Sequence, residues 1–317
     1  MDRDCARLER RFPKKILGTI VVALLFTAAT WFAYEYSLIE MKLPVGGQSG
    51  AAVEPLIDPF AGTTFEARAV YVIDTQGRVR MDKNGDAQLP LASITKIALV
   101  LAASEVLPKD MLITIKRDIS GNGKGDTLPA GTTWKVQDLI DFTLVASSND
   151  GAEELARAAD APIREKYPEA PQGRATLWRM NMLIKDIGLK NTYFTNVTGL
   201  DESATQSGAY GSARDVAALM LYAMAEHPET FSATKMESVT VTSTTGVSAS
   251  VKNTDEALPA ISGLVMGKTG LTDLAGGNLT VTFDARGRRY AAVVLGSTEE
   301  GRFADMTKIA KILARTK

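Results

Sequence analysis

Segments with strand-like patterns open and close the main part of the chain, and helical patterns fill its middle. The stretch from Ala67, ARAVYVIDTQGRVRMDKNGD, alternates apolar and polar residues around two turn signals, which predicts a β-hairpin. Near the C-terminus, LVMGKTGLT, GNLTVTFDARG and RRYAAVVLGST have the same strand-like character. This order predicts an α+β fold, with an antiparallel sheet built from N- and C-terminal strands and packed with a helical region.

The N-terminus has the charge pattern of a membrane anchor. Residues 1–15 carry six Lys/Arg and three Asp/Glu, and the next eighteen residues contain no charge. Eighteen helical residues span about 27 Å, close to the hydrocarbon thickness of a bilayer. A cleaved signal peptide is the competing interpretation. We expect a single-pass cell-membrane protein. Its parts would be a basic cytoplasmic tail (1–15), one transmembrane helix acting as signal anchor (16–36), a flexible linker (37–62) and an extracytoplasmic catalytic domain (63–317).

Composition excludes several kinds of functional site. The net charge of −1 provides no basic excess for binding nucleic acid. The single cysteine, Cys5, precedes the apolar segment, so we expect neither an internal disulfide framework nor a cysteine-based zinc site. The single histidine, His227, lies in a polar helix-end context that gives no support for a Ser-His-Asp triad. We therefore predict no metal and no cofactor, and a serine hydrolase of this sequence would need a base other than histidine.

The stretch PLASITKIALVLAA places Ser93 and Lys96 three residues apart at the start of an apolar run. Residues at this spacing share one face of a helix. The apolar run predicts a central buried helix, and we expect Ser93 to begin it as a capping residue. Burial would lower the pKa of the lysine, and a neutral amine could then accept the serine proton. An ordinary capping serine beside a solvated lysine is the alternative reading.

Two further motifs supply polar groups that such a pair would need. ASSNDG places Ser147 and Asn149 in an expected loop between helices, where Ser147 could relay a proton and Asn149 could bind a substrate amide. GKTG places Lys268 and Thr269 on an expected strand, where they could hold a carboxylate, while Gly270 would allow a ligand backbone to approach. Taken singly, the first motif also fits a simple turn and the second an edge strand protected by a lysine.

The three motifs together, in this order, resemble those of the penicillin-recognising serine enzymes. Within that group the chain is most similar to the D-alanyl-D-alanine carboxypeptidases of the low-molecular-mass penicillin-binding proteins, peptidase family S11. PLASITK looks like the family's Pro-x-Ala-Ser-x-Thr-Lys, and MNMLIKDIGLKNTYFTNVTGL, YGSARDVAAL and KTGLTDLAGGNL match further family segments. The resemblance covers about residues 65–315 and implies a β-lactamase/transpeptidase-like fold.

The resemblance also implies a role for each site residue. Ser93 would be the acyl nucleophile that attacks the carbonyl between the two terminal D-alanines of a peptidoglycan stem peptide. Lys96 would be the general base, and Ser147 would pass the proton to the departing D-alanine. The backbone N–H groups of Ser93 and Leu271 would form the oxyanion hole. The remaining substrate-binding residues would be Asn149, Lys268, Thr269, Gly270 and Arg302. β-Lactams would inhibit the enzyme by acylating the same serine.

Two other functions share these motifs. A class A serine β-lactamase needs a glutamate that activates the deacylating water. Glu165 and Glu169 lie in the right region, but neither has the Glu-x-x-Leu-Asn context of that class. A membrane-tethered sensor that binds peptidoglycan or β-lactam without turnover is the second alternative.

The sequence departs from the family pattern at Leu271. The family often has an aromatic residue or a histidine at this position, after the glycine of the KTG motif, but the oxyanion hole needs only the backbone of the residue.

Overall fold

The computed structural model describes residues 58–121 and 126–315 of the 317-residue chain. These residues lie in one compact unit, which runs from Glu54 to Lys317. The predicted basic tail, the transmembrane anchor and most of the linker lie outside the described residues. Within the described ranges, no helix combines the length and the apolar character needed to cross a membrane.

The unit is built on a five-stranded antiparallel sheet with the order β10-β11-β12-β1-β2. β1 pairs with β12, and Val72 lies opposite Ala292, so the N-terminal hairpin continues the C-terminal strands. The predicted sheet from both ends of the chain is therefore confirmed. Its strands are β1 (Ala69–Asp74), β2 (Val79–Lys83), β10 (Leu264–Thr272), β11 (Gly276–Ala285) and β12 (Arg288–Ser297).

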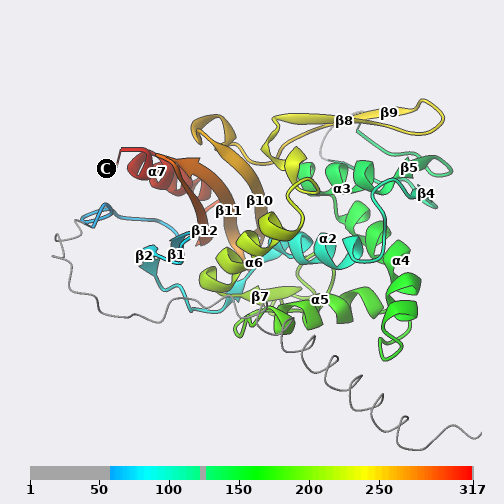
Figure 1. Ribbon diagram of the computed structural model, residues 1–317, viewed down its shortest axis with the longest axis horizontal. Coiled ribbons are helices and arrows are strands. Elements are labelled where there is room, and N and C mark those ends of the chain that lie inside the picture. Colours follow the sequence, from blue (N-terminus) through cyan, green and yellow to red (C-terminus); the bar gives the residue numbers. More distant parts are fainter. Residues whose placement is uncertain (1–57, 122–125, 316–317) are drawn as a thin grey trace, which may run out of the picture. The chain divides into compact units, whose positions relative to one another are not determined.

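Both faces of this sheet are covered, because alternate side chains of each strand enter two separate apolar clusters. Val72 and Val294 pack in the cluster that contains α7 (Gly301–Arg315). Tyr71 and Val293 enter the other cluster, with α6 (Ala213–Glu226) and the helices beyond it. Figure 1 shows α7 beside β11 and β12, and the other helices on the opposite side. Each fully buried side chain of this kind contributes about 1.5–3 kcal/mol, so both helical layers are needed for the sheet to be stable.

The helical region is arranged around α2 (Lys96–Ser104), which contacts each of its neighbouring helices. Every residue of α2 from Lys96 to Ala103 is buried, as its apolar sequence predicts. Three of these residues are alanines, whose small side chains let the neighbours approach closely. The neighbours are α3 (Val136–Val145), α4 (Asn149–Lys166), α5 (Ala175–Asp186) and α6.

Short elements complete the fold. The predicted hairpin after α6 is confirmed as β8 (Ser238–Thr242) and β9 (Ser248–Lys252). The other small sheets consist of β3 (Leu89–Pro90), β6 (Tyr193–Phe194) and β7 (Ala209–Gly211), and of β4 (Leu112–Thr114) and β5 (Thr133–Lys135). The 3₁₀ helices are η1 (Ala92–Thr95), η2 (Ser232–Lys235) and η3 (Leu258–Ala260).

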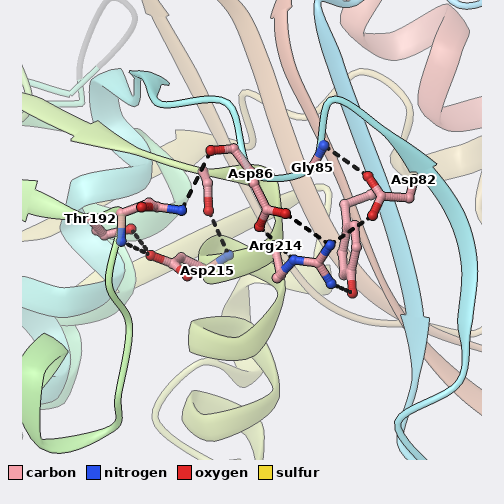
Figure 2. Close-up of polar contacts among 9 residues, drawn as sticks. Asp82, Gly85, Asp86, Thr192, Arg214 and Asp215 are labelled. Carbon is pink, nitrogen blue, oxygen red and sulfur yellow. Dashed lines mark hydrogen bonds and ion pairs between the residues drawn. The ribbon is translucent and has the colours of Figure 1, made fainter.

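A polar network joins the sheet to the start of α6 (Figure 2). The guanidinium of Arg214 donates to Asp82 Oδ2 at 2.8 Å, Asp86 Oδ1 at 2.6 Å and the Tyr71 hydroxyl at 2.7 Å. Its carbon also lies 4.7 Å from the centre of the Tyr71 ring. The predicted cap of this helix is confirmed, because Ser212 Oγ accepts from the backbone N–H of the third helical residue at 3.1 Å. The β2–β3 turn is thereby held against α6.

Candidate active site

Ser93 lies in η1, a tight turn that leads directly into α2. The expectation that Ser93 caps α2 is wrong: the residue before α2 is Thr95, and neither 3₁₀ helix nor α-helix has a side-chain cap here. The turn begins at Ala92, which has a φ of 50°, a left-handed conformation that costs about 1–2 kcal/mol. The chain therefore turns sharply in front of the helix, which presents Ser93 at the end of α2 rather than along it.

Two glycines allow other segments to pack against this turn. A side chain at Gly270 of β10 would come within 2.7 Å of the Leu91 carbonyl oxygen and 3.3 Å of the Ser93 nitrogen. A side chain at Gly199 would collide with the Ala92 carbonyl. The KTG strand and the segment after β6 therefore lie against the serine turn from two sides.

Lys96 is fully buried, with a relative exposure of 0%. Its Nζ lies 2.7 Å from Ser93 Oγ, 2.8 Å from Asn149 Oδ1 and 3.0 Å from the carbonyl oxygen of Thr198. A neutral amine has two N–H groups and one lone pair. The two carbonyl-type oxygens can only accept, so they take the two N–H groups, and the lone pair is left facing the Ser93 hydroxyl. In its charged form Lys96 donates to all three oxygens, whereas in its neutral form it is placed to accept a proton from Ser93.

The electrostatic environment favours the same protonation state. Burial holds the pKa of Lys96 well below its ordinary value near 10.5, and the charge of Lys268 lowers this pKa further. Among the described residues, no carboxylate forms an ion pair with Lys96. Desolvation and the neighbouring charge both disfavour the ammonium form of Lys96, so both move its pKa toward the range in which the amine is neutral.

The SSN segment lies at the junction between α3 and α4. Ser147 has a φ of 56°, and Lys268 Nζ donates to its hydroxyl at 2.8 Å. Ser148 is the N-cap of α4, and its hydroxyl accepts from Gly151 N at 3.1 Å. The expectation that Asn149 lies in a loop is wrong, because it is the first residue of α4. The cap places Asn149 in the first helical turn, which directs its amide oxygen to Lys96.

Lys268 and Thr269 lie on β10, the edge strand of the sheet, and both are buried. The Lys268 Nζ donates to Ser147 Oγ at 2.8 Å, to the carbonyl of Thr269 at 2.9 Å and, at 3.5 Å, to Thr269 Oγ1. Burial lowers the pKa of Lys268 to about 7; Arg302 lowers it too, while Asp255 raises it. All three N–H groups of the ammonium have protein partners, so Lys268 provides charge while the hydroxyls beside it are available to a ligand.

The end of β10 carries the remaining predicted residues. The Leu271 side chain is 43% exposed and lies beside the site. Arg302, the second residue of α7, is 6% exposed, and its Nη1 donates to the carbonyl oxygen of Gly270 at 2.8 Å. The structure thus brings together all nine residues that the sequence singled out, from η1, α2, the α3–α4 junction, β10 and α7.

Sequence reasoning missed three contributors. Thr198 holds Lys96 through its backbone carbonyl, and a backbone group leaves no mark on the sequence. Thr254 lies in the connection between β9 and β10, with its hydroxyl 2.6 Å from Thr269 Oγ1. Asp255 is buried beside it, and burial raises its pKa to about 6. The last two belong to a polar stretch, NTDE, which is indistinguishable from a surface loop until its position is known.

Comparison with known proteins gives a consistent result. A family model described as D-alanyl-D-alanine carboxypeptidase, peptidase S11, matches residues 57–299. The chain is 30% identical over 264 residues to the D-alanyl-D-alanine carboxypeptidase DacF of Bacillus subtilis, covering 77% of this chain and 61% of that protein. It is 30% identical over 260 residues to DacA of Escherichia coli K12, with coverages of 77% and 60%. The chain thus spans about three fifths of the length of these relatives.

Solved structures share the fold. Penicillin-binding protein D2 of Listeria monocytogenes, in its ampicillin-bound form, superposes with a TM-score of 0.65 at 27% identity, over 78% of this chain and 97% of that one. The carboxypeptidase DacD of Francisella tularensis gives a TM-score of 0.67 at 23% identity, over 84% and 73% of the two chains. A mutant of the Streptomyces K15 DD-transpeptidase gives a TM-score of 0.63 at 23% identity, over 78% of this chain and 98% of that one. The last two likenesses concern the fold alone, which is therefore transpeptidase-like.

Proposed function

The chain belongs to the peptidase S11 family of D-alanyl-D-alanine carboxypeptidases, and on this premise we propose that it removes the terminal D-alanine of peptidoglycan stem pentapeptides. The proposed reaction proceeds through an acyl-enzyme on Ser93. The observation that carries it is the contact set of Lys96, a buried lysine whose Nζ lies 2.7 Å from Ser93 Oγ and within 3.0 Å of two oxygens that can only accept hydrogen bonds. A side chain held in this way has no evident structural use, because a buried lysine without a counter-charge destabilises the fold.

Acylation begins when the neutral Lys96 accepts the Ser93 proton. Ser93 Oγ then forms a bond to the carbonyl carbon of the penultimate D-alanine, and the carbonyl oxygen becomes an oxyanion. The N–H groups of Ser93 and Leu271 stabilise that charge. When the C–N bond breaks, the proton held by Lys96 passes through the Ser147 hydroxyl to the leaving amine, which returns Lys96 to its neutral form; Ser147 Oγ lies 2.8 Å from Lys268 Nζ. Water then attacks the ester, Lys96 accepts a proton from this water, and the proton passes to Ser93 Oγ as the acyl bond breaks.

The substrate carboxylate is placed at the end of β10. Thr269 donates a hydrogen bond to it, and the buried charges of Lys268 and Arg302 attract it. Asn149 lies across the site and is available to the amide of the peptide. β-Lactams carry a carboxylate and a strained amide at a comparable spacing, so they acylate Ser93 by the same route.

We extend the proposal to the location of the enzyme. The eighteen uncharged residues that follow the basic tail support a single transmembrane anchor with the catalytic domain outside the cytoplasm, where peptidoglycan is found. Expression of the full chain followed by membrane fractionation and carbonate extraction tests this part. Recovery in the carbonate-soluble fraction would contradict anchoring without affecting the proposed chemistry.

The activity is tested by incubating the full chain with a stem pentapeptide and measuring free D-alanine. Turnover supports the carboxypeptidase. Stoichiometric acylation by penicillin without D-alanine release would instead indicate a sensor, and rapid penicillin hydrolysis a β-lactamase. Ser93→Ala should abolish both D-alanine release and acylation, whereas Ser238→Ala, on the exposed face of β8, should leave both unchanged.

A further inference from the structure

Arg302 is buried in a position that the carboxylate-binding role does not by itself explain. Its side chain crosses the end of β11, where a side chain at Gly277 would come within 3.2 Å of the Arg302 Cδ. Nη1 donates to the carbonyl oxygen of Gly270 at 2.8 Å. Nε is buried and has no hydrogen-bond partner within the described ranges. Among the described residues, the hydrogen-bond partner of this guanidinium is therefore a main-chain carbonyl of the catalytic strand.

The carbonyl of Gly270 and the N–H of Leu271 belong to the same peptide group. A trans peptide is planar, and its C=O and N–H point in opposite directions. A group that holds the carbonyl oxygen therefore also sets the direction of the Leu271 N–H. This N–H is the second donor of the proposed oxyanion hole.

The alternation along β10 shows which way that N–H points. β10 is an edge strand that pairs with β11 alone among the described strands, so alternate residues direct their backbone groups away from the sheet. The N–H of Gly267 donates to Thr234 Oγ1 at 3.1 Å, and the carbonyl of Thr269 accepts from Lys268 Nζ at 2.9 Å, both outside the ladder. Leu271 is the next residue in this series. Its N–H thus points away from β11, in the part of β10 that lies against η1 and Ser93.

We propose that Arg302 is a positioning residue for the oxyanion hole, acting through the Gly270–Leu271 peptide. This inference rests on the proposed acyl-enzyme function and adds to it a role for Arg302 that does not involve the substrate carboxylate. The charged donor on the carbonyl oxygen holds the peptide plane and polarises it, which makes the Leu271 N–H a better donor to the developing oxyanion. Pre-orientation of donors is the main source of this kind of stabilisation.

The two roles of Arg302 predict different dependences on the substrate. A residue that only holds the carboxylate matters for benzylpenicillin but not for its methyl ester, in which the carboxylate charge is absent. A residue that positions the oxyanion hole matters for both compounds. Loss of a whole oxyanion donor costs about 10²–10³ in rate, so we expect a loss of about 10–100-fold when only the support of one donor is removed.

The test uses the full-length protein and mass-spectrometric measurement of Ser93 acylation. Arg302→Met should slow acylation about 10–100-fold with benzylpenicillin and by at least tenfold with its methyl ester. In D-alanine release, it should lower kcat more than it raises KM. Arg302→Lys keeps the charge without the geometry of the guanidinium, so it should recover binding of the carboxylate but not the ester rate. Arg289→Met, at the far turn of the same sheet, is the matched control.

Each outcome supports or overturns the inference. Circular dichroism and thermal unfolding establish whether the variants are folded. If Arg302→Met does not fold, the comparison of the two penicillins is made with Arg302→Lys. A wild-type rate with the methyl ester in a folded Arg302 variant overturns the positioning role and leaves the proposed function intact. If the wild-type protein neither releases D-alanine nor is acylated by either penicillin, the proposed function fails and the positioning role fails with it.

Discussion

At the scale of single residues, the proposed mechanism makes the pH range of the reaction depend on two buried lysines. In that mechanism Lys96 is neutral when it accepts a proton, and Lys268 is charged when it attracts a carboxylate. Burial lowers the pKa of both lysines, that of Lys268 to about 7, which sets the alkaline limit for the charged form of Lys268. The charge on Lys268 itself helps to keep Lys96 neutral, so the two requirements support each other below neutral pH.

We expect kcat/KM for a peptide with a free C-terminal carboxylate to fall above about pH 7, as Lys268 loses its proton. A stopped-flow or discontinuous assay of D-alanine release between pH 5 and 10 measures this limb. With penicillin methyl ester as the acylating agent the alkaline fall should be absent, because no carboxylate is bound. An identical alkaline limb for both compounds would show that Lys268 acts in proton transfer rather than in binding.

Ionisation of the buried Asp255 carboxyl lowers the stability of the fold at the site. It is 5% exposed, and its Oδ2 has no hydrogen-bond partner within the described ranges. Burial raises its pKa to about 6, although the Ala257 N–H, Arg302 and Lys268 all lower it. Since the pKa is higher in the folded state, the carboxyl contributes stability below its unfolded pKa near 3.8, and this contribution is lost as pH rises through about 6.

Asp255→Asn removes the ionisation but keeps an oxygen for the Ala257 N–H. The free energy of unfolding of the variant, relative to wild type, should therefore increase between pH 4 and pH 6 by up to about 3 kcal/mol and then level off. Urea unfolding at a series of pH values measures this difference. Glu237→Gln, at an exposed position outside the charges that act on Asp255, is the control. A difference that stays constant with pH would show that Asp255 does not ionise in this range.

At the scale of elements, the connection between β9 and β10 links two parts of the site. Thr254 N donates to the carbonyl of Val145, at the end of α3, at 3.3 Å, and its hydroxyl lies 2.6 Å from that of Thr269. The Thr269 oxygen already accepts from Lys268, so Thr254 is the better donor of the pair. The Thr269 hydrogen is then left free for a ligand.

Thr254→Val should raise KM for carboxylate-bearing peptides about tenfold, which corresponds to one hydrogen bond, with little change in kcat. Thr254→Ser should behave like wild type because it retains the hydroxyl. Steady-state kinetics of D-alanine release measure both, with Thr240→Val on the exposed face of β8 as the control. A KM in the valine variant that is unchanged or lower would contradict this direction, because a Thr269 hydroxyl that donates to Thr254 in the wild type would be released toward the substrate.

At the scale of the whole catalytic unit, strands from the two ends of the chain and helices from its middle meet at one site. Ser93 and Lys96 belong to the helical side, Lys268 and Thr269 to the sheet, and Ser147 to the α3–α4 junction. Their distances therefore depend on how firmly the sheet is held against the helices. The Arg214 network of Figure 2 is one of the contacts that hold the sheet against the helices.

Arg214→Met should lower the free energy of unfolding by about 1 kcal/mol. The Arg214 side chain is 41% exposed, so the ion pairs themselves are screened and the contact with Tyr71 carries most of the effect. Thermal unfolding should show a decrease of about 2–4 °C, which Arg164→Met on the exposed side of α4 should not reproduce. A decrease above 10 °C would indicate that the network is essential for folding of the unit.

The sequence by itself determined the strands, most helices and the identity of the chemical groups. Alternating polarity predicted the N-terminal hairpin of the antiparallel sheet, because a strand presents successive side chains to opposite faces. The apolar run after Ser93 predicted a buried α2, and burial accounts for the lowered pKa of Lys96. The single histidine, His227, lies in a context that gives no support for a Ser-His-Asp triad, and this directed attention to lysine as the base. These features depend on residue type and on spacing along the chain, which the sequence contains.

Only the tertiary structure decided how these groups meet. The carbonyl of Thr198 completes the contacts of Lys96, and no residue type identifies a carbonyl in advance. The 3₁₀ turn at Ser93 and the helical position of Asn149 depend on packing between distant segments, which overrides local preference. Arg302 reaches Gly270 across 32 positions in the chain because α7 begins behind the end of β11. The distances between residues that are far apart in the chain arise from packing. For that reason the local sequence identified the site residues but not their positions relative to one another.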